Sequence, residues 1–94
     1  MAKKTNPEWL KELDGRTEIT LSRAVETAGA KVSVLSMREP TVADNEATSS
    51  MEGTDATREI HEFANLCEMS PDEFRKLSLK DYQRVRAAYL AFIV

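Results

Sequence analysis

Apolar and polar positions alternate in the first part of the chain. Residues 17–25 place Ile19, Leu21 and Val25 on one face, with polar residues between them. This period of two is typical of a strand with one buried face. The alternation resumes after a short break that contains a glycine, and we therefore expect a β-hairpin over residues 17–38.

The alternation slips within its second half. Val32 and Val34 fall on one face of the expected strand, whereas Leu35 and Met37 fall on the other. Either a bulge lies at Val34–Leu35 or both faces of the strand are covered. A lone hairpin is barely stable in water, so helices must cover its apolar face. We expect a core that joins the strands to later helices and contains Ile19, Leu21, Val32, Val34, Ile60, Phe63, Tyr82 and Val85.

The strand pattern ends abruptly at residues 38–41. Pro40 cannot donate to a sheet ladder and disfavours helical angles at Glu39, so the strand must stop there. Thr41 can cap the first amides of a helix, and Asp44 places a negative charge in its first turn. The adjacent stop and start predict that the chain turns at once to lay a helix on the hairpin.

Helical spacing dominates the remainder of the chain. Apolar residues recur every three or four positions, and Ser or Thr followed three positions later by Asp or Glu marks several helix starts. The first helix is expected to be weak because its body is rich in Asn, Thr and Ser. We expect helices at about 42–51, 55–67, 71–77 and 79–93. The predicted fold class is α+β, with an N-terminal β-hairpin packed against three to four C-terminal α-helices.

Length and composition allow one small domain. The chain has 94 residues, of which 41% are hydrophobic. Residues 1–16 are mostly polar, with Trp9 and Leu10 as isolated anchors, and we expect them to form a flexible N-terminal arm. Trp9 either folds back on the domain or, on a mobile arm, serves as a binding anchor. We assign residues 17–94 to a single α+β domain.

The sequence carries no sign of export or membrane insertion. It has a single cysteine, Cys67, so no intrachain disulfide can form, which favours a reducing compartment. No apolar run approaches the length of a membrane span, and the N-terminus lacks the hydrophobic segment of a signal peptide. We therefore expect a cytosolic protein with no membrane partner.

The charges are unevenly distributed, although their sum is only −3. Residues 39–73 carry ten acidic residues and one basic residue, whereas residues 74–94 carry five basic residues and one acidic residue. These blocks are either solvated helix faces that attract each other or, for the acidic block, a docking surface for a basic partner. The mild net charge argues against nucleic acid as the partner.

The sequence contains no catalytic or metal-binding constellation. The segment HEFAN at 61–65 resembles the zinc motif His-Glu-x-x-His, but Asn65 stands where the second histidine belongs. We expect His61 on a helix surface and Cys67 as a small core side chain. The scattered glycines form no phosphate-binding loop. We expect no enzymatic activity, no cofactor and no metal.

Three segments, taken in order, resemble a known protein family. They are MREPTVAD at 37–44, ANLCEMSPDEF at 64–74 and LKDYQRV at 79–85. Over about residues 17–93 the chain looks like the tail assembly chaperones of long-tailed bacteriophages, of the type found in Mu-like and P2-like contractile-tailed phages. None of the three segments is a catalytic signature, so the resemblance rests on their order.

The resemblance implies a non-enzymatic protein that binds the tape measure protein, keeps this long helical protein soluble and recruits tail tube subunits. It also implies a location in the cytoplasm of the infected bacterial host and absence from the mature virion. Many such chaperones occur in a short form and a longer, frameshifted form. The end of the sequence at AFIV fits a short form, so a second copy or a longer form is a further candidate partner.

Two other functions stay open at this point. One is a small phage adaptor or completion protein retained in the virion, and the other is a small regulator that binds DNA through the C-terminal helix. For the chaperone function, Tyr89 and Phe92 are candidate protein-binding residues because they lie where the core is expected to be thin. Arg38 and Glu39 are further candidates, at the polar border of the hairpin–helix junction.

Overall fold

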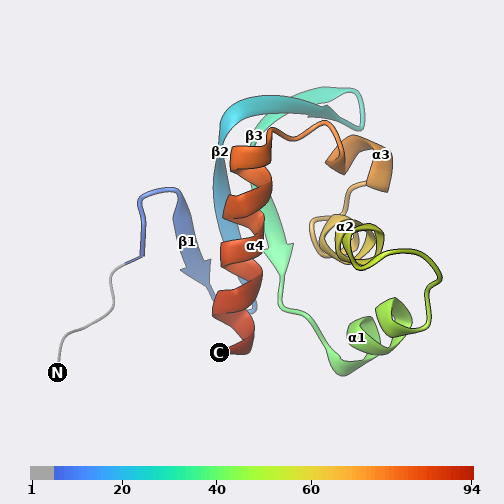
Figure 1. Ribbon diagram of the computed structural model, residues 1–94. Coiled ribbons are helices and arrows are strands. Elements are labelled where there is room, and N and C mark those ends of the chain that lie inside the picture. The colour runs from blue at the N-terminus through green and yellow to red at the C-terminus, as the bar shows by residue number, and fades with distance from the viewer. Residues whose placement is uncertain (1–5) are drawn as a thin grey trace, which may run out of the picture.

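The computed structural model describes residues 6–94, in which an antiparallel sheet is followed by helices (Figure 1). The α+β class is therefore confirmed. The strand order in the sheet is β1-β2-β3, so strands that are consecutive in sequence are neighbours. The elements are β1 (Leu10–Leu13), β2 (Arg16–Thr27), β3 (Ala30–Arg38), α1 (Val42–Ser49), α2 (Asp55–Leu66), α3 (Pro71–Phe74) and α4 (Leu79–Ile93).

The first strand corrects the expectation of a flexible arm over residues 1–16. Leu10–Leu13 pairs with β2, and Leu10, which lies opposite Ile19, is buried. The tight connection between the two strands uses Gly15 at a φ of +76°, which glycine adopts without strain. Residues 1–5 of the expected arm lie outside the described residues. The sheet thus has a third strand because a short amphipathic segment can pair with an exposed edge.

The second correction concerns the register of β2 and β3. The two strands pair up to Thr20 opposite Val34 and resume at Val25 opposite Val32. Four residues of β2 therefore face one residue of β3, and the irregularity lies in β2 rather than at Val34–Leu35. The set of β3 side chains that points toward the core changes at this irregularity. As a result, Leu35 is buried and Val34 is 46% exposed. The prediction that Val34 belongs to the core is wrong.

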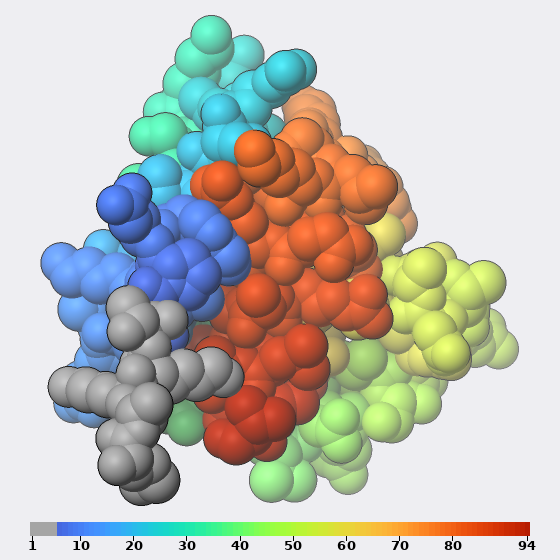
Figure 2. Space-filling view, turned by 60° about the vertical axis from the view of Figure 1, so that its left-hand side comes forward, coloured from blue at the N-terminus to red at the C-terminus, as the bar shows by residue number. Residues whose placement is uncertain are grey.

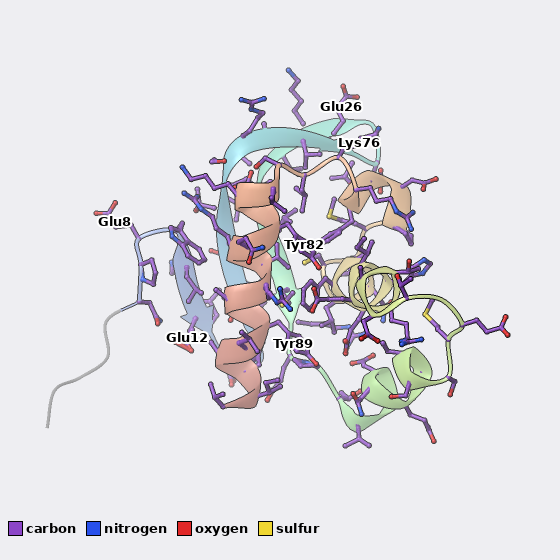
Figure 3. The ribbon with its side chains drawn as sticks, viewed as in Figure 1. Glu8, Glu12, Glu26, Lys76, Tyr82 and Tyr89 are labelled. Carbon is purple, nitrogen blue, oxygen red and sulfur yellow. The ribbon has the colours of Figure 1, made fainter. Side chains whose placement is uncertain are left out.

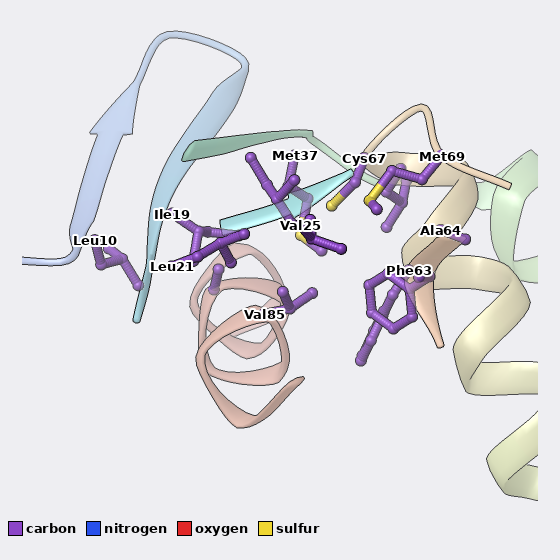
Figure 4. Packing of buried hydrophobic residues seen from close by; sticks show 14 residues of the cluster. Leu10, Ile19, Leu21, Val25, Met37, Phe63, Ala64, Cys67, Met69 and Val85 are labelled. Carbon is purple, nitrogen blue, oxygen red and sulfur yellow. The ribbon is translucent and has the colours of Figure 1, made fainter. Parts of the chain in front are cut away.

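Helices α2, α3 and α4 cover one face of the sheet and enclose the core, whereas α1, expected on the hairpin, packs against α2. In Figure 1, α4 crosses the sheet in front of β2 and β3, with α2 and α3 beside it. The buried cluster includes Leu21, Phe63 and Val85, together with Met37 from β3 (Figure 4). Of the other expected core residues, Ile19 is buried, and Val32, Ile60 and Tyr82 are partly buried against the cluster.

Hydroxyl side chains cap the helices where the sequence predicted. Thr41, Thr54, Ser70 and Ser78 each accept a hydrogen bond from the amide three residues on, which satisfies one free donor of the first turn. Three helices end earlier than expected, α1 at Ser49, α2 at Leu66 and α3 at Phe74. No helix within residues 6–94 is both long and apolar enough to cross a membrane.

Candidate functional site

Exposed apolar side chains gather where the end of α4 approaches the start of α1. Leu90 is 47% exposed, Ile93 55% and Val42 87%. Figure 2 shows the C-terminal end of α4, in red, beside the green surface of α1. Between them lies a hollow of about 330 Å³, which we call the α1–α4 groove. It is lined by Pro40, Thr41, Val42, Asn45, Glu62, Tyr89 and Ile93.

A second hollow lies on the other side of α1. This α1–α2 hollow has a volume of about 230 Å³ and is lined by Asp44, Ala47, Thr48, Met51, His61, Glu62 and Asn65. Glu62 therefore borders both hollows, and α1 separates them. His61, expected on a helix surface, is half-buried in the wall of this hollow.

The floor of the groove is a hydrogen-bonded pair between α2 and α4. The hydroxyl of Tyr89 donates to Oε2 of Glu62 at 3.4 Å. Figure 3 shows that Tyr82 and Tyr89 lie on the side of α4 that faces α2. Burial raises the pKa of Glu62, and the charges of Asp44 and Glu59 raise it further, against the opposing effect of the Tyr89 hydroxyl. Within the described part of the chain, no lysine or arginine pairs with Glu62.

Helix α1 is attached by polar contacts at its first turn. Arg38 donates to Asp44 through two bonds, Nη1 to Oδ2 at 2.7 Å and Nη2 to Oδ1 at 2.9 Å. The amide of Thr41 donates to Asp44 Oδ2 at 2.8 Å, which completes a capping box. These bonds, with Arg38 foremost, hold the pKa of Asp44 far below its ordinary value. Since Val42–Ser49 includes no buried residue, α1 depends on this junction rather than on the core.

A third hollow lies at the opposite end of α4, near its start. Its volume is about 310 Å³, and its walls are mostly apolar. Leu79, on its rim, is 73% exposed. The lining residues are Ala56, Ile60, Phe74, Arg75, Leu77, Leu79 and Tyr82. This α2–α4 hollow shares no residue with the α1–α4 groove, so it serves as a comparison surface.

The four candidate residues from the sequence have different positions. Tyr89 lines the groove, whereas the ion-pair partner of Arg38, Asp44, lines the α1–α2 hollow. Glu39 is exposed beside Pro40, and its amide donates to the carbonyl of Gly15 at 3.0 Å. Phe92 is partly buried against the core and does not line the groove. Their role in partner binding stays a prediction.

Of the residues that line the groove, only Tyr89 was a candidate from the sequence, and the missed residues include Val42, Glu62 and Ile93. Val42 carried a signal, since it is an apolar residue in the first turn of a helix with polar residues at the next helical spacings. Glu62 and Ile93 carried none, because their exposure depends on how α1, α2 and α4 meet. Cys67 is buried as expected, and burial raises the pKa of its thiol to about 12.

The chemistry offered by this region is that of a contact surface. No group of three His, Cys, Asp or Glu residues that could hold a metal ion is found among residues 6–94. The groove combines exposed apolar side chains with hydrogen-bonding groups, which suits the docking of an amphipathic helix.

Comparison with known proteins gives one family match. A family model described as "phage tail assembly chaperone proteins, E, or 41 or 14" matches residues 18–94. No curated protein matches the chain. No solved structure matches it either.

Proposed function

The chain belongs to the phage tail assembly chaperone family, and we propose that it binds the tape measure protein of its phage through the α1–α4 groove. In this function it keeps the tape measure protein soluble in the cytoplasm of the infected host and recruits tail tube subunits. It leaves before the tail is complete. The family's role is non-enzymatic, and its partners are proteins of tail assembly.

The observation that carries this proposal is the exposed apolar lining of the groove. Val42 in α1 and Ile93 at the end of α4 both line the hollow, and both are more than half exposed. Burying such side chains against a partner contributes roughly 25 cal/mol for each Å² of apolar surface removed from water. An aggregating, helical protein supplies apolar faces of this kind, and covering them keeps it in solution.

Release is as necessary to the proposed function as binding. Helix α1 forms one wall of the groove, and it is held by polar bonds around Asp44 rather than by buried side chains. An element with few buried contacts opens at low free energy. A groove with one such wall can therefore widen to admit a helix and let it leave.

The alternative of DNA binding through α4 finds less support. Arg84 donates to the carbonyl of Thr20 at 2.8 Å and its guanidinium carbon lies 5.2 Å from the centre of the Trp9 ring. Arg86 pairs with Glu59 at 3.5 Å. These arginines stabilise the fold, which leaves few free cations on α4 for contacts to phosphate groups.

The test is co-expression of this protein with the tape measure protein, followed by measurement of the soluble fraction. The variant Ile93→Ser removes an apolar side chain from the groove, where it is 55% exposed, and Leu79→Ser removes one that is 73% exposed from the α2–α4 hollow. We expect wild type and Leu79→Ser to keep the tape measure protein soluble and Ile93→Ser to lose this activity.

Mass spectrometry of purified virions completes the test. The chaperone function predicts that the protein is absent from mature tails. If the tape measure protein stays insoluble, or if the protein occurs in tails at a defined copy number, the chaperone function is wrong and the adaptor function replaces it.

A further inference from the structure

The acidic block of the sequence converges on the groove and its neighbouring hollow. Among residues 6–94, no lysine or arginine lines the α1–α4 groove or the α1–α2 hollow. The acidic side chains that line them are Asp44 and Glu62. By contrast, the charged residue that lines the α2–α4 hollow is Arg75. The apolar surfaces at the two ends of α4 therefore carry opposite charge.

Asp44 and Glu62 differ in what they can offer a partner. The carboxylate of Asp44 is occupied by Arg38 and by Thr41. Glu62 accepts only the long bond of 3.4 Å from Tyr89, and its carboxylate has no cationic partner in the described part of the chain. A half-buried carboxylate attracts a cation more strongly than an exposed one, because water screens it less.

The rim of the groove repeats the same sign of charge. Glu39 precedes Pro40 and is exposed. Glu46 is exposed one helical turn after Val42, so the two side chains share a face of α1. An apolar strip bordered by carboxylates is complementary to a helix whose apolar face is bordered by cations. Like charges along such a border are unfavourable and exclude acidic helices.

We propose that the α1–α4 groove selects amphipathic helices whose apolar face is flanked by lysine or arginine, with Glu62 receiving one of these cations. This inference rests on the proposed function and names the kind of tape measure segment that the groove binds. Complementary charge also steers the encounter, so association is faster at low salt.

The experiment uses the full chain and three synthetic helical peptides with the same leucine face. Their flanking positions carry lysine and arginine, glutamine, or glutamate, and binding is measured by fluorescence anisotropy at low and at physiological salt. We expect the basic peptide to bind about tenfold or more tightly than the acidic one, with the neutral peptide between them. A fourth peptide with the basic composition but a dispersed apolar face should bind weakly.

Two matched variants locate the effect. Glu62→Gln should remove much of the preference for the basic peptide, whereas Glu52→Gln, which removes an exposed charge outside both hollows, should leave it unchanged. Ile93→Ser should weaken the binding of all three peptides that have an intact apolar face.

The outcomes separate this inference from the proposed function. If the three peptides bind equally well and Ile93→Ser weakens the binding of each, the proposed charge selection is wrong, but the groove is still the binding site. The proposal fails if the basic peptide with a dispersed apolar face binds as well as the basic peptide with an intact one. It also fails if Glu52→Gln reduces the preference for the basic peptide as much as Glu62→Gln does, because the attraction is then general to the acidic block. If no peptide binds, the groove itself is not the docking site.

Discussion

Asp81, at the start of α4, accepts a hydrogen bond of 2.8 Å from the backbone amide of Ser22 in β2, 59 residues earlier in the chain. Its second carboxylate oxygen accepts the amide of Arg23 at 3.3 Å, and its side chain is fully buried. Both amides belong to the irregular stretch between Thr20 and Val25, where β2 has residues that do not pair with β3. One carboxylate therefore satisfies two amides of the irregular stretch and ties α4 to the sheet.

The first prediction follows from this contact. Asp81→Ala should lower the free energy of unfolding by about 1–3 kcal/mol, because it leaves the two partly buried amides of Ser22 and Arg23 without their acceptor. Asp81→Asn keeps one acceptor oxygen and should lose less. Urea denaturation measures both, and a change within error for Asp81→Ala would show that the contact does not hold α4 in place.

The pH dependence of stability provides a second test of Asp81. Burial raises its pKa, but the hydrogen bonds from Ser22 and Arg23 outweigh this effect, and the folded pKa lies below the ordinary value. A carboxyl with a lowered folded pKa stabilises the protein above its unfolded pKa of about 4, and this contribution is lost as the pH falls further. The stability of Asp81→Asn should therefore decline less than that of wild type below about pH 4. Parallel curves for the two proteins would contradict the assignment.

The faces of the sheet predict a contrast between two apolar residues. Ile19 is fully buried, so Ile19→Ala should destabilise by about 2–4 kcal/mol. Val34 is 46% exposed, so Val34→Ala should change stability by less than about 0.5 kcal/mol. Chemical denaturation of the pair tests the register, and a large loss at Val34 would mean that this part of β3 faces the core.

Cys67 should be unreactive in the folded protein. Its side chain is buried, and burial raises the pKa of the thiol to about 12, so very little thiolate forms at neutral pH. A colorimetric disulfide reagent should modify Cys67 slowly in buffer and rapidly in denaturant. Fast modification of the folded protein would contradict the packing of α2 against the sheet.

The junction between Arg38 and Asp44 should control the opening of α1. The ion pair is partly exposed, with 42% of the Arg38 side chain accessible, so its contribution is about 1 kcal/mol or less. Arg38→Gln should raise hydrogen exchange in Val42–Ser49 by up to roughly fivefold and leave the core amides unchanged. Arg75→Gln, which breaks an ion pair with Asp72 whose arginine is 44% exposed and which lies away from α1, is the control. Equal exchange in α1 for both variants would show that the ion pair does not fasten this helix.

Local rules predicted most of the elements. The capping residues Thr41, Ser70 and Ser78 marked the helix starts correctly, because capping depends on neighbouring residues alone. Two features of the sheet were not predictable in this way. The strand at Leu10–Leu13 has too few residues for a periodic signal, and the position of Val34 depends on the number of residues that β2 inserts opposite it.

The candidate groove was predicted only in part, for a similar reason. Tyr89 was found because it lies on the apolar side of a periodic helix near the end of the chain. Phe92 has the same periodicity, yet it packs against the core. Whether an apolar side chain on α4 is covered depends on how α1 and α2 are placed beside it. The spacing of apolar residues within α4 cannot predict that placement.

Site-specific photocrosslinking in cells that make both proteins tests the central claim most directly. A benzoylphenylalanine replaces Ile93 at the groove in one variant and Leu79 at the α2–α4 hollow in the other, and both positions are more than half exposed. We predict a covalent product with the tape measure protein from position 93 and little or none from position 79. Crosslinking from position 79 but not from position 93, or from neither position while the tape measure protein is soluble, would contradict binding in the α1–α4 groove.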